Sequence, residues 1–430
     1  MYRFRVALVA GLLASPAAPR SETANAAERG AGREPASSPD PKDLAIPPAE
    51  LTRARDLVRR LGSDLFRERE NAHTDLAKMG RLAKPVLTDA ALTDPDPEVR
   101  ARVSRLLPKA TADDMKARLD TFLADSDGKF EHDLPGWGAF KKSVGADKAA
   151  RDLFAEVVKT PANMELLAAL EKPTEAAGRA VADRRHALYA ILSRRFQGVQ
   201  ATGPGQTITI PDITALLVAE TVVENRHIPQ GQFRFLGAHY FLQQAPATAA
   251  LTGTGVAHAE SFKKLVAVWL ETRNDPNEMQ NLAYLVSNQL RGFKEAVPLL
   301  RRIVANEAVQ GWARGTAVTA LVREKGKEEI PTLKAMLKNE NQLVSVWLGN
   351  NAGGNNNGTL QVRDLALAHL LTLNDQDLKS FGFEFPQGSG QVLNATSFGS
   401  YAFPNDAARD AAFKKWAEFE KNPPKPAEKK

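Results

Sequence analysis

The sequence contains no cysteine among its 430 residues. This absence excludes disulfide bonds, thiolate metal sites, cysteine nucleophiles and a cysteine-linked lipid anchor. Stability must therefore come from packing, and an apolar fraction of 43% is enough for a sizeable core.

Long apolar runs are also missing. The run Val6–Ala14 near the N-terminus is too short to span a bilayer. It follows Arg3 and Arg5, and the Ala-Asn-Ala sequence at 24–26 fits a small-residue cleavage site. We therefore predict that residues 1–26 are a signal peptide. The mature protein is expected to be exported, periplasmic or extracellular, with no transmembrane span.

The chain has little excess of either charge. Its 57 basic and 51 acidic residues leave a formal net charge of +6, and the two signs are interleaved along segments such as residues 51–70. Binding to nucleic acid requires basic charge concentrated on one surface, so this pattern argues against a nucleic-acid partner.

Histidine is sparse, with seven residues, and none falls in a metal-ligand motif. The acidic stretch at 125–133 fails as a calcium loop, because placing Gly128 at loop position 6 puts Leu123 and Leu134 at positions 1 and 12. An Asx-type turn accounts for that stretch better. We predict no catalytic, metal-binding or cofactor-binding residues and no cofactor.

Helical periodicity is abundant from Ala49 onward. Apolar residues recur every three or four positions, as in Leu51, Ala54, Val58 and Leu61, and again in Leu65, Ala72, Leu76 and Met79. The fold class is predicted to be all-α. Three short alternating stretches are expected to form β-like insertions, at residues 206–211, 344–347 and 391–398.

The turn at residues 94–97 is the clearest helix start. Asp96 can accept hydrogen bonds from the free N–H groups of the first turn, and Pro97 suits the first helical position. Glu98 lies favourably at the positive end of the helix, and Arg100 is placed for an ion pair with Asp96. This cluster is predicted to be architectural and not catalytic.

The order of apolar helix, Asp/Pro turn and apolar helix recurs, and it resembles HEAT-type helical repeats. That family places a proline in the first helix, an aspartate in the turn and a basic residue in the second helix. The matching residues are Pro85, Asp94 or Asp96, and Arg100 in one unit; Asp275 in the next; Pro298 and Arg314 in a third; and Pro331 and Arg363 in a fourth. The resemblance implies a HEAT-like α-solenoid of stacked helical pairs.

The chain divides on these patterns into seven segments. They are a signal peptide (1–26), a disordered linker (27–48), N-terminal HEAT-like helices (49–110), a helical middle region (111–260), HEAT-like repeats (261–373), a C-terminal capping segment (374–420) and a disordered tail (421–430).

Three further expectations concern particular residues. The Gly/Asn-rich stretch 349–359 is interpreted as a flexible insertion joining the two helices of one repeat. Asp406 is expected to cap a last helix whose apolar face carries Ala412 and Trp416 and covers the repeat ending near Leu373. All five tryptophans are expected to be core anchors.

These patterns favour a non-catalytic scaffold that binds a protein partner through a helical-repeat surface. Two alternatives stay open. One is an enzyme with a site in the middle region, which a pocket holding several of Asp133, His132, Arg185 and His186 would support. The other is a binder of glycan or polyanion at the cell envelope. Oligomeric state is not predicted.

Overall fold

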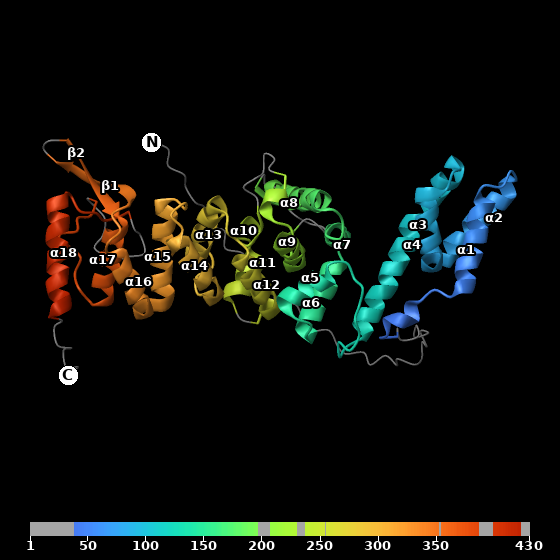
Figure 1. Ribbon diagram of the computed structural model, residues 1–430, viewed down its shortest axis with the longest axis horizontal. Coiled ribbons are helices and arrows are strands. Elements are labelled where there is room, and N and C mark those ends of the chain that lie inside the picture. The colour runs from blue at the N-terminus through green and yellow to red at the C-terminus, as the bar shows by residue number, and fades with distance from the viewer. Residues whose placement is uncertain are drawn as a thin grey trace, which may run out of the picture. The chain divides into compact units, whose positions relative to one another are not determined.

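The protein is mostly α-helical, with one two-stranded hairpin among the described residues (Figure 1). The computed structural model describes residues 38–196, 207–229, 237–253, 255–351, 354–386 and 399–422. The predicted signal peptide, the possible strand at 391–398 and most of the predicted tail lie outside these ranges.

The α-helices follow one another with short connections. They are α1 (Pro48–Leu61), α2 (Phe66–Met79), α3 (Lys84–Thr93), α4 (Pro97–Ala124), α5 (Trp137–Val144), α6 (Lys148–Val158), α7 (Pro161–Ala169), α8 (Thr174–Phe196), α9 (Ile210–Val222), α10 (Ala238–Phe241), α11 (Ala245–Thr252), α12 (Ala259–Glu271), α13 (Pro276–Asn288), α14 (Val297–Ala305), α15 (Gly311–Lys325), α16 (Ile330–Met336), α17 (Val362–Leu373) and α18 (Asp406–Lys421). Short 3₁₀ helices are η1 (Pro41–Leu44), η2 (Gly80–Ala83), η3 (Asn225–His227), η4 (Lys294–Ala296), η5 (Gly326–Glu329) and η6 (Lys379–Phe381).

Local capping chemistry sets several helix starts. Asp96 accepts a hydrogen bond from the backbone N–H of Glu98 at 2.8 Å, which confirms its predicted role as N-cap of α4. Arg100 does not pair with the Asp96 carboxylate as expected. Its Nη1 donates instead to the carbonyl oxygens of Asp94 and Pro95, at 2.6 and 3.0 Å, which are left free at the end of α3.

The same arginine contact recurs in two other helical pairs. Arg69 on α2 donates to the carbonyl oxygens of Ser63 and Asp64, just beyond the end of α1. Arg314 on α15 donates to the carbonyl oxygen of Val304 near the end of α14. In each case a basic side chain on the second helix satisfies carbonyl groups at the end of the first.

Helices α3, α14 and α16 share another feature, a proline in the first turn directly after a 3₁₀ helix. Pro85 follows η2 in α3, Pro298 follows η4 in α14, and Pro331 follows η5 in α16. Proline is tolerated there because the first N–H groups of a helix have no intrahelical partner. Pro298 and Pro331 thus lie just inside the starts of helices, as their sequence positions predict.

Among the residues that the structure describes, the buried apolar side chains form two clusters. The first comprises residues of α1–α4 from Ala54 to Ala110, and the second runs from Phe122 to Trp416. Helix α4 contributes to both, because it continues through Pro108 without interruption. Of the predicted apolar stripe on α2, Ala72, Leu76 and Met79 are buried in the first cluster. Leu65 precedes α2 and is exposed.

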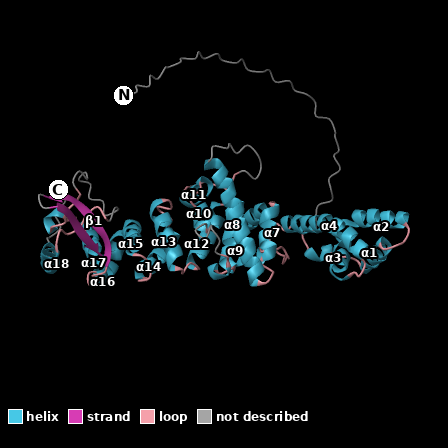
Figure 2. Cartoon of the chain, turned by 90° about the horizontal axis from the view of Figure 1, so that it is seen from above, coloured by secondary structure: helices cyan, strands magenta, loops and turns pink. Residues whose placement is uncertain are grey.

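The Gly/Asn-rich stretch is not an unstructured insertion. Strand β1 (Gln342–Asn351) pairs antiparallel with β2 (Gly354–Gln361), so most of this stretch belongs to a hairpin that joins α16 to α17 (Figure 2). Close packing accounts for the glycine at position 358. A Cβ on Gly358 would lie only 2.7 Å from the Cβ of Ala402. The strand at 344–347 is confirmed. The one predicted at 206–211 is wrong, because Thr209 caps α9 through a capping box with Asp212.

The last helix packs as its sequence pattern predicts. Ala412 and Trp416 of α18 are buried, and Lys334 on α16 forms an ion pair with Glu420. Its N-cap is Asn405 rather than Asp406, because the Asn405 side chain accepts the N–H of Ala408 at 2.9 Å. Part of the predicted disordered linker is also ordered. It forms η1, whose Leu44 carbonyl accepts a hydrogen bond from Arg81.

Candidate functional site

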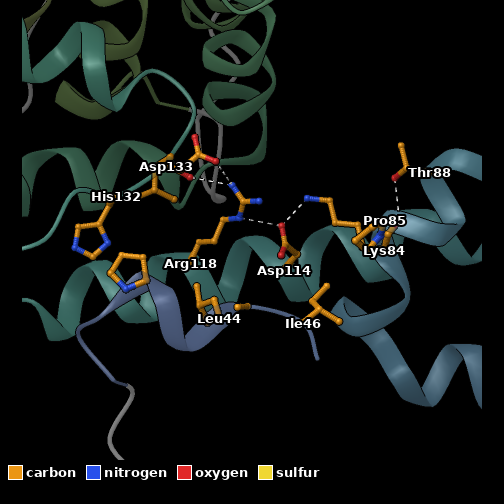
Figure 3. Close-up of a pocket in the computed structure, with 12 residues that line it drawn as sticks. Leu44, Ile46, Lys84, Pro85, Thr88, Asp114, Arg118, His132 and Asp133 are labelled. Carbon is orange, nitrogen blue, oxygen red and sulfur yellow. Dashed lines mark hydrogen bonds and ion pairs between the residues drawn. The ribbon is translucent and has the colours of Figure 1, made fainter. Parts of the chain in front are cut away.

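The four residues named for a possible enzyme site do not come together. His132 and Asp133 line one cavity of about 540 Å³, shown in Figure 3. Arg185 lines a different cavity of about 810 Å³. His186 is exposed on α8 and lines neither. The structure therefore brings two of the four residues together in one cavity and places a third in another.

The charged groups of the first cavity are paired with one another. Asp114 accepts contacts from Lys84 and from the Nε of Arg118, and Arg118 Nη1 lies 2.9 Å from the carboxylate of Asp133 (Figure 3). His132 faces Asp125, with 2.9 Å between its Nε2 and the carboxylate Oδ2. These contacts account for the polar side chains without a ligand.

Asp125 closes a wider turn than the Asx-type turn expected from the sequence, in which a side chain accepts the N–H two residues on. Its carboxylate accepts the backbone N–H groups of Lys129 and Phe130 at 2.9 and 3.1 Å. Burial raises the pKa of Asp125, but the hydrogen bonds from His132 and these two backbone groups outweigh it and leave the pKa below its usual range. The Asp125–His132 pair is thereby a buried structural contact at the end of α4.

The second cavity is built around Glu220, near the end of α9. Its walls come from α8, α9, η3, α10 and the connection from α12 to α13. That connection includes Asp275, the turn aspartate of the predicted repeats, whose side chain accepts the N–H of Glu278 and caps α13. Gly178 on α8 permits the close approach of η3, because a Cβ there would lie 2.0 Å from the carbonyl oxygen of His227.

Glu220 is fully buried and has four partners, which lie on α8, α10, α12 and the connection from α12 to α13. Its Oε1 accepts from Arg185 Nε at 2.8 Å and from the backbone N–H of Ala238 at 3.0 Å. Its Oε2 accepts from Trp269 Nε1 at 3.0 Å and lies 3.8 Å from Arg273 Nη1. Burial raises the pKa of Glu220, but the charges of Arg185 and Arg273 outweigh it and keep the pKa below the usual value.

Arg273 links Glu220 to a second acid. Its Nη2 donates to the Glu220 carbonyl oxygen at 2.6 Å, and its Nη1 lies 3.4 Å from Oε1 of Glu278. Burial is the main influence on Glu278 and raises its pKa, with the Arg273 charge acting in the opposite direction. The cluster thus contains one firmly ionised carboxylate and one that protonates more readily than usual.

Two nitrogen atoms in this cavity have no hydrogen-bond partner among the described residues. They are Nη2 of Arg185 and Nδ1 of His239. The two side chains are only 5% and 6% exposed. A Cβ added to Gly237 would lie 3.0 Å from the His239 atom and 3.8 Å from the Arg185 atom, so both nitrogens border the same small space.

Sequence reasoning missed Glu220, although a signal was present. Glu220 is the last acid in the apolar run of α9, and an ionised side chain inside such a run must find a partner when it is buried. Its partners are 35 and 53 residues away along the chain, at Arg185 and Arg273, and no local pattern connects them.

Metal binding has no support within the described ranges, where no group of three or more candidate ligand side chains could hold an ion. No helix in the described part of the chain combines the length and apolar character needed to cross a membrane. In comparisons with protein-family models, curated proteins and solved structures, nothing matched this chain. The fold therefore defines a mainly helical protein of many packed helices.

Proposed function

We propose that this protein is an exported interaction scaffold of HEAT-like helical pairs, and that it binds a protein partner through a surface formed by α13, α15 and the adjoining strand β1. The packing order supports the repeat. Helix α1 contacts α3 while α2 contacts α4, and α12 contacts α14 while α13 contacts α15. First helices thus pack on first helices and second helices on second helices, as expected for stacked pairs.

The recurring arginine contact supports the same interpretation. Arg69, Arg100 and Arg314 each lie on a second helix and donate to carbonyl groups at or just beyond the end of the first. Two of them, Arg100 and Arg314, are the basic residues of the resemblance to HEAT repeats. One physical task, satisfying the free carbonyls, is therefore repeated in separate pairs.

The observation that carries the binding role is a set of three exposed aromatic residues, here called the aromatic face. Tyr284 on α13, Trp312 on α15 and Trp347 on β1 are 51%, 38% and 50% exposed. The expectation that all five tryptophans are buried is thus wrong for two of them. Tyrosine and tryptophan are the residues most enriched at the energetic centres of protein interfaces.

The elements that carry the aromatic face are in contact. Helix α13 packs on α15, and the Ser287 hydroxyl on α13 donates to the Thr316 carbonyl on α15. Tyr284 is about one turn from Ser287 on α13, and Trp312 is about one turn from Thr316 on α15. Helix α15 in turn contacts β1, and a Cβ on Gly311 would lie 3.0 Å from the Cα of Leu343. Exposed apolar groups on adjoining elements are typical of an interaction surface.

The test is capture of a partner from an extracellular or periplasmic extract of the source organism. The intact protein should retain a specific protein, and the variant with Tyr284, Trp312 and Trp347 all changed to alanine should not. A matched control changes Leu65, Phe66 and Leu92 to alanine, which are 63%, 66% and 80% exposed in the N-terminal part of the described chain. Equal capture by both triple variants, or no capture by the intact protein, would refute the proposal.

Export has a separate test. The features that predict export are the basic start, the short apolar run and the Ala-Asn-Ala sequence at 24–26. N-terminal sequencing of the protein recovered from its native source should begin near Ala27. Recovery of the chain with Met1 intact in the cytosol would contradict export.

A further inference from the structure

The Glu220 cavity has the properties of a ligand site, independently of the aromatic face. Its volume of about 810 Å³ is within the range of small-molecule pockets. Its walls carry acids as well as arginines, and the acids have partners. Glu220 pairs with Arg185 and Arg273, Glu224 with Arg226, and Asp275 accepts a backbone N–H.

The two buried polar atoms of this cavity that lack a hydrogen-bond partner among the described residues are both nitrogens. Arg185 Nη2 can only donate a hydrogen bond, and it is buried where the described residues offer it no acceptor. His239 Nδ1 is buried beside the same space and also lacks a partner among them. A buried donor without an acceptor is costly, by about 1–3 kcal/mol, so such an atom in a cavity points to a missing acceptor.

We propose that this cavity binds a small carboxylate, whose oxygen atoms accept hydrogen bonds from Arg185 Nη2 and from His239 Nδ1–H. A guanidinium presents planar, paired donors that suit a carboxylate. The second acid near Arg273, Glu278, lies 3.4 Å from that arginine, so its carboxylate already has a partner within the cluster.

Gly237 provides a way to fill the space without replacing any of the charged side chains. Its φ of −67° and ψ of 174° are open to any residue, so alanine introduces no backbone strain. Its new methyl group would occupy the position 3.0 Å from His239 Nδ1, where the carboxylate is expected. Gly138 is the matched control, since a Cβ there meets nothing within 4 Å.

The experiment titrates the full chain with succinate, and with its uncharged analogue succinamide, and follows thermal unfolding and calorimetric heat. Sodium chloride at equal ionic strength controls for a general salt effect. The intact protein and G138A should bind succinate and unfold at higher temperature in its presence. G237A should bind at least about tenfold more weakly, and succinamide should have no effect on any of them.

A second variant, H239L, separates ligand binding from a structural role. Replacing an unpartnered buried nitrogen by an apolar group should leave the ligand-free protein as stable as before or more so, while succinate binding is lost. The proposal is overturned if succinate does not bind the intact protein, if G237A binds it as well as G138A does, or if H239L binds it unchanged. Equal binding of succinamide would also overturn it, because the charge would then be irrelevant.

Discussion

Arg409 on α18 and Asp364 on α17 form a buried ion pair in which the arginine Nε lies 3.0 and 3.1 Å from the two carboxylate oxygens. Arg409 Nη2 also donates to the Thr359 carbonyl on β2 at 2.8 Å, so one guanidinium joins the last helix, α17 and the hairpin. The C-terminal segment is therefore held by a charged contact as well as by its apolar stripe.

Removing one partner of this pair should be strongly destabilising. We expect Arg409→Ala to lower the free energy of unfolding by about 3–5 kcal/mol, because it leaves a buried carboxylate without its counter-ion. Urea unfolding measures the change. The half-exposed pair between Lys334 and Glu420 is the control, and Glu420→Ala should cost under about 1 kcal/mol. Similar losses from both variants would show that burial does not set the cost.

Trp416 should contribute mainly through packing. Trp416→Ala is expected to lower the free energy of unfolding by about 3 kcal/mol or more, because the side chain is buried against the main core. Trp347→Ala removes the same side chain from an exposed position and should change stability by less than about 0.5 kcal/mol. Chemical unfolding of the two variants side by side tests this, and an equal loss would mean that Trp347 is packed.

Gly358 tests whether the Gly/Asn-rich stretch is packed. A methyl group there would lie 2.8 Å from both Leu348 Cδ1 and the Phe403 carbonyl oxygen, so Gly358→Ala should destabilise by about 1–3 kcal/mol. Gly138→Ala, in the open, should have no cost or a small benefit within its helix. If thermal melts of Gly358→Ala and the unchanged chain coincide, the stretch behaves as the flexible insertion that its composition suggests.

His369 should make stability depend on pH. Burial lowers its pKa from 6.5 to about 4, so the folded state resists protonation that the unfolded state accepts. This contribution is fully present above pH 6.5 and is lost as the pH falls toward 4, by about 3 kcal/mol in all. As the pH falls from 7 to 4, the His369→Gln variant should therefore gain about 3 kcal/mol of stability relative to the unchanged chain. Parallel pH curves for the two proteins would contradict this.

Features set by neighbours in the chain could be predicted from the sequence. The Asp96 cap depends on one turn of helix, and the burial of Ala412 and Trp416 depends on a period of 3.6 residues. The cap of α18 was misplaced by one residue because Asn405 and Asp406 are both good caps, and only the backbone geometry separates them.

Features set by distant residues could not be predicted. Asparagine and glycine are unfavourable in strands, and β2 is held by pairing with β1 and by the bridge from Thr359 to Phe403, some 40 residues onward. The Glu220 cavity likewise depends on Arg185, His239 and Arg273, which come from α8, α10 and the connection from α12 to α13. Their sequence spacing follows no motif.

The central claim is that the aromatic face binds a protein partner. The most direct measurement is the dissociation constant of the captured partner for the intact protein and for Trp312→Ala and Leu92→Ala. Trp312 lies in the aromatic face, whereas Leu92 is 80% exposed at the end of α3. We predict that Trp312→Ala weakens binding about 30-fold or more, corresponding to about 2 kcal/mol, and that Leu92→Ala leaves it unchanged. Equal dissociation constants for the intact protein and Trp312→Ala would contradict the claim.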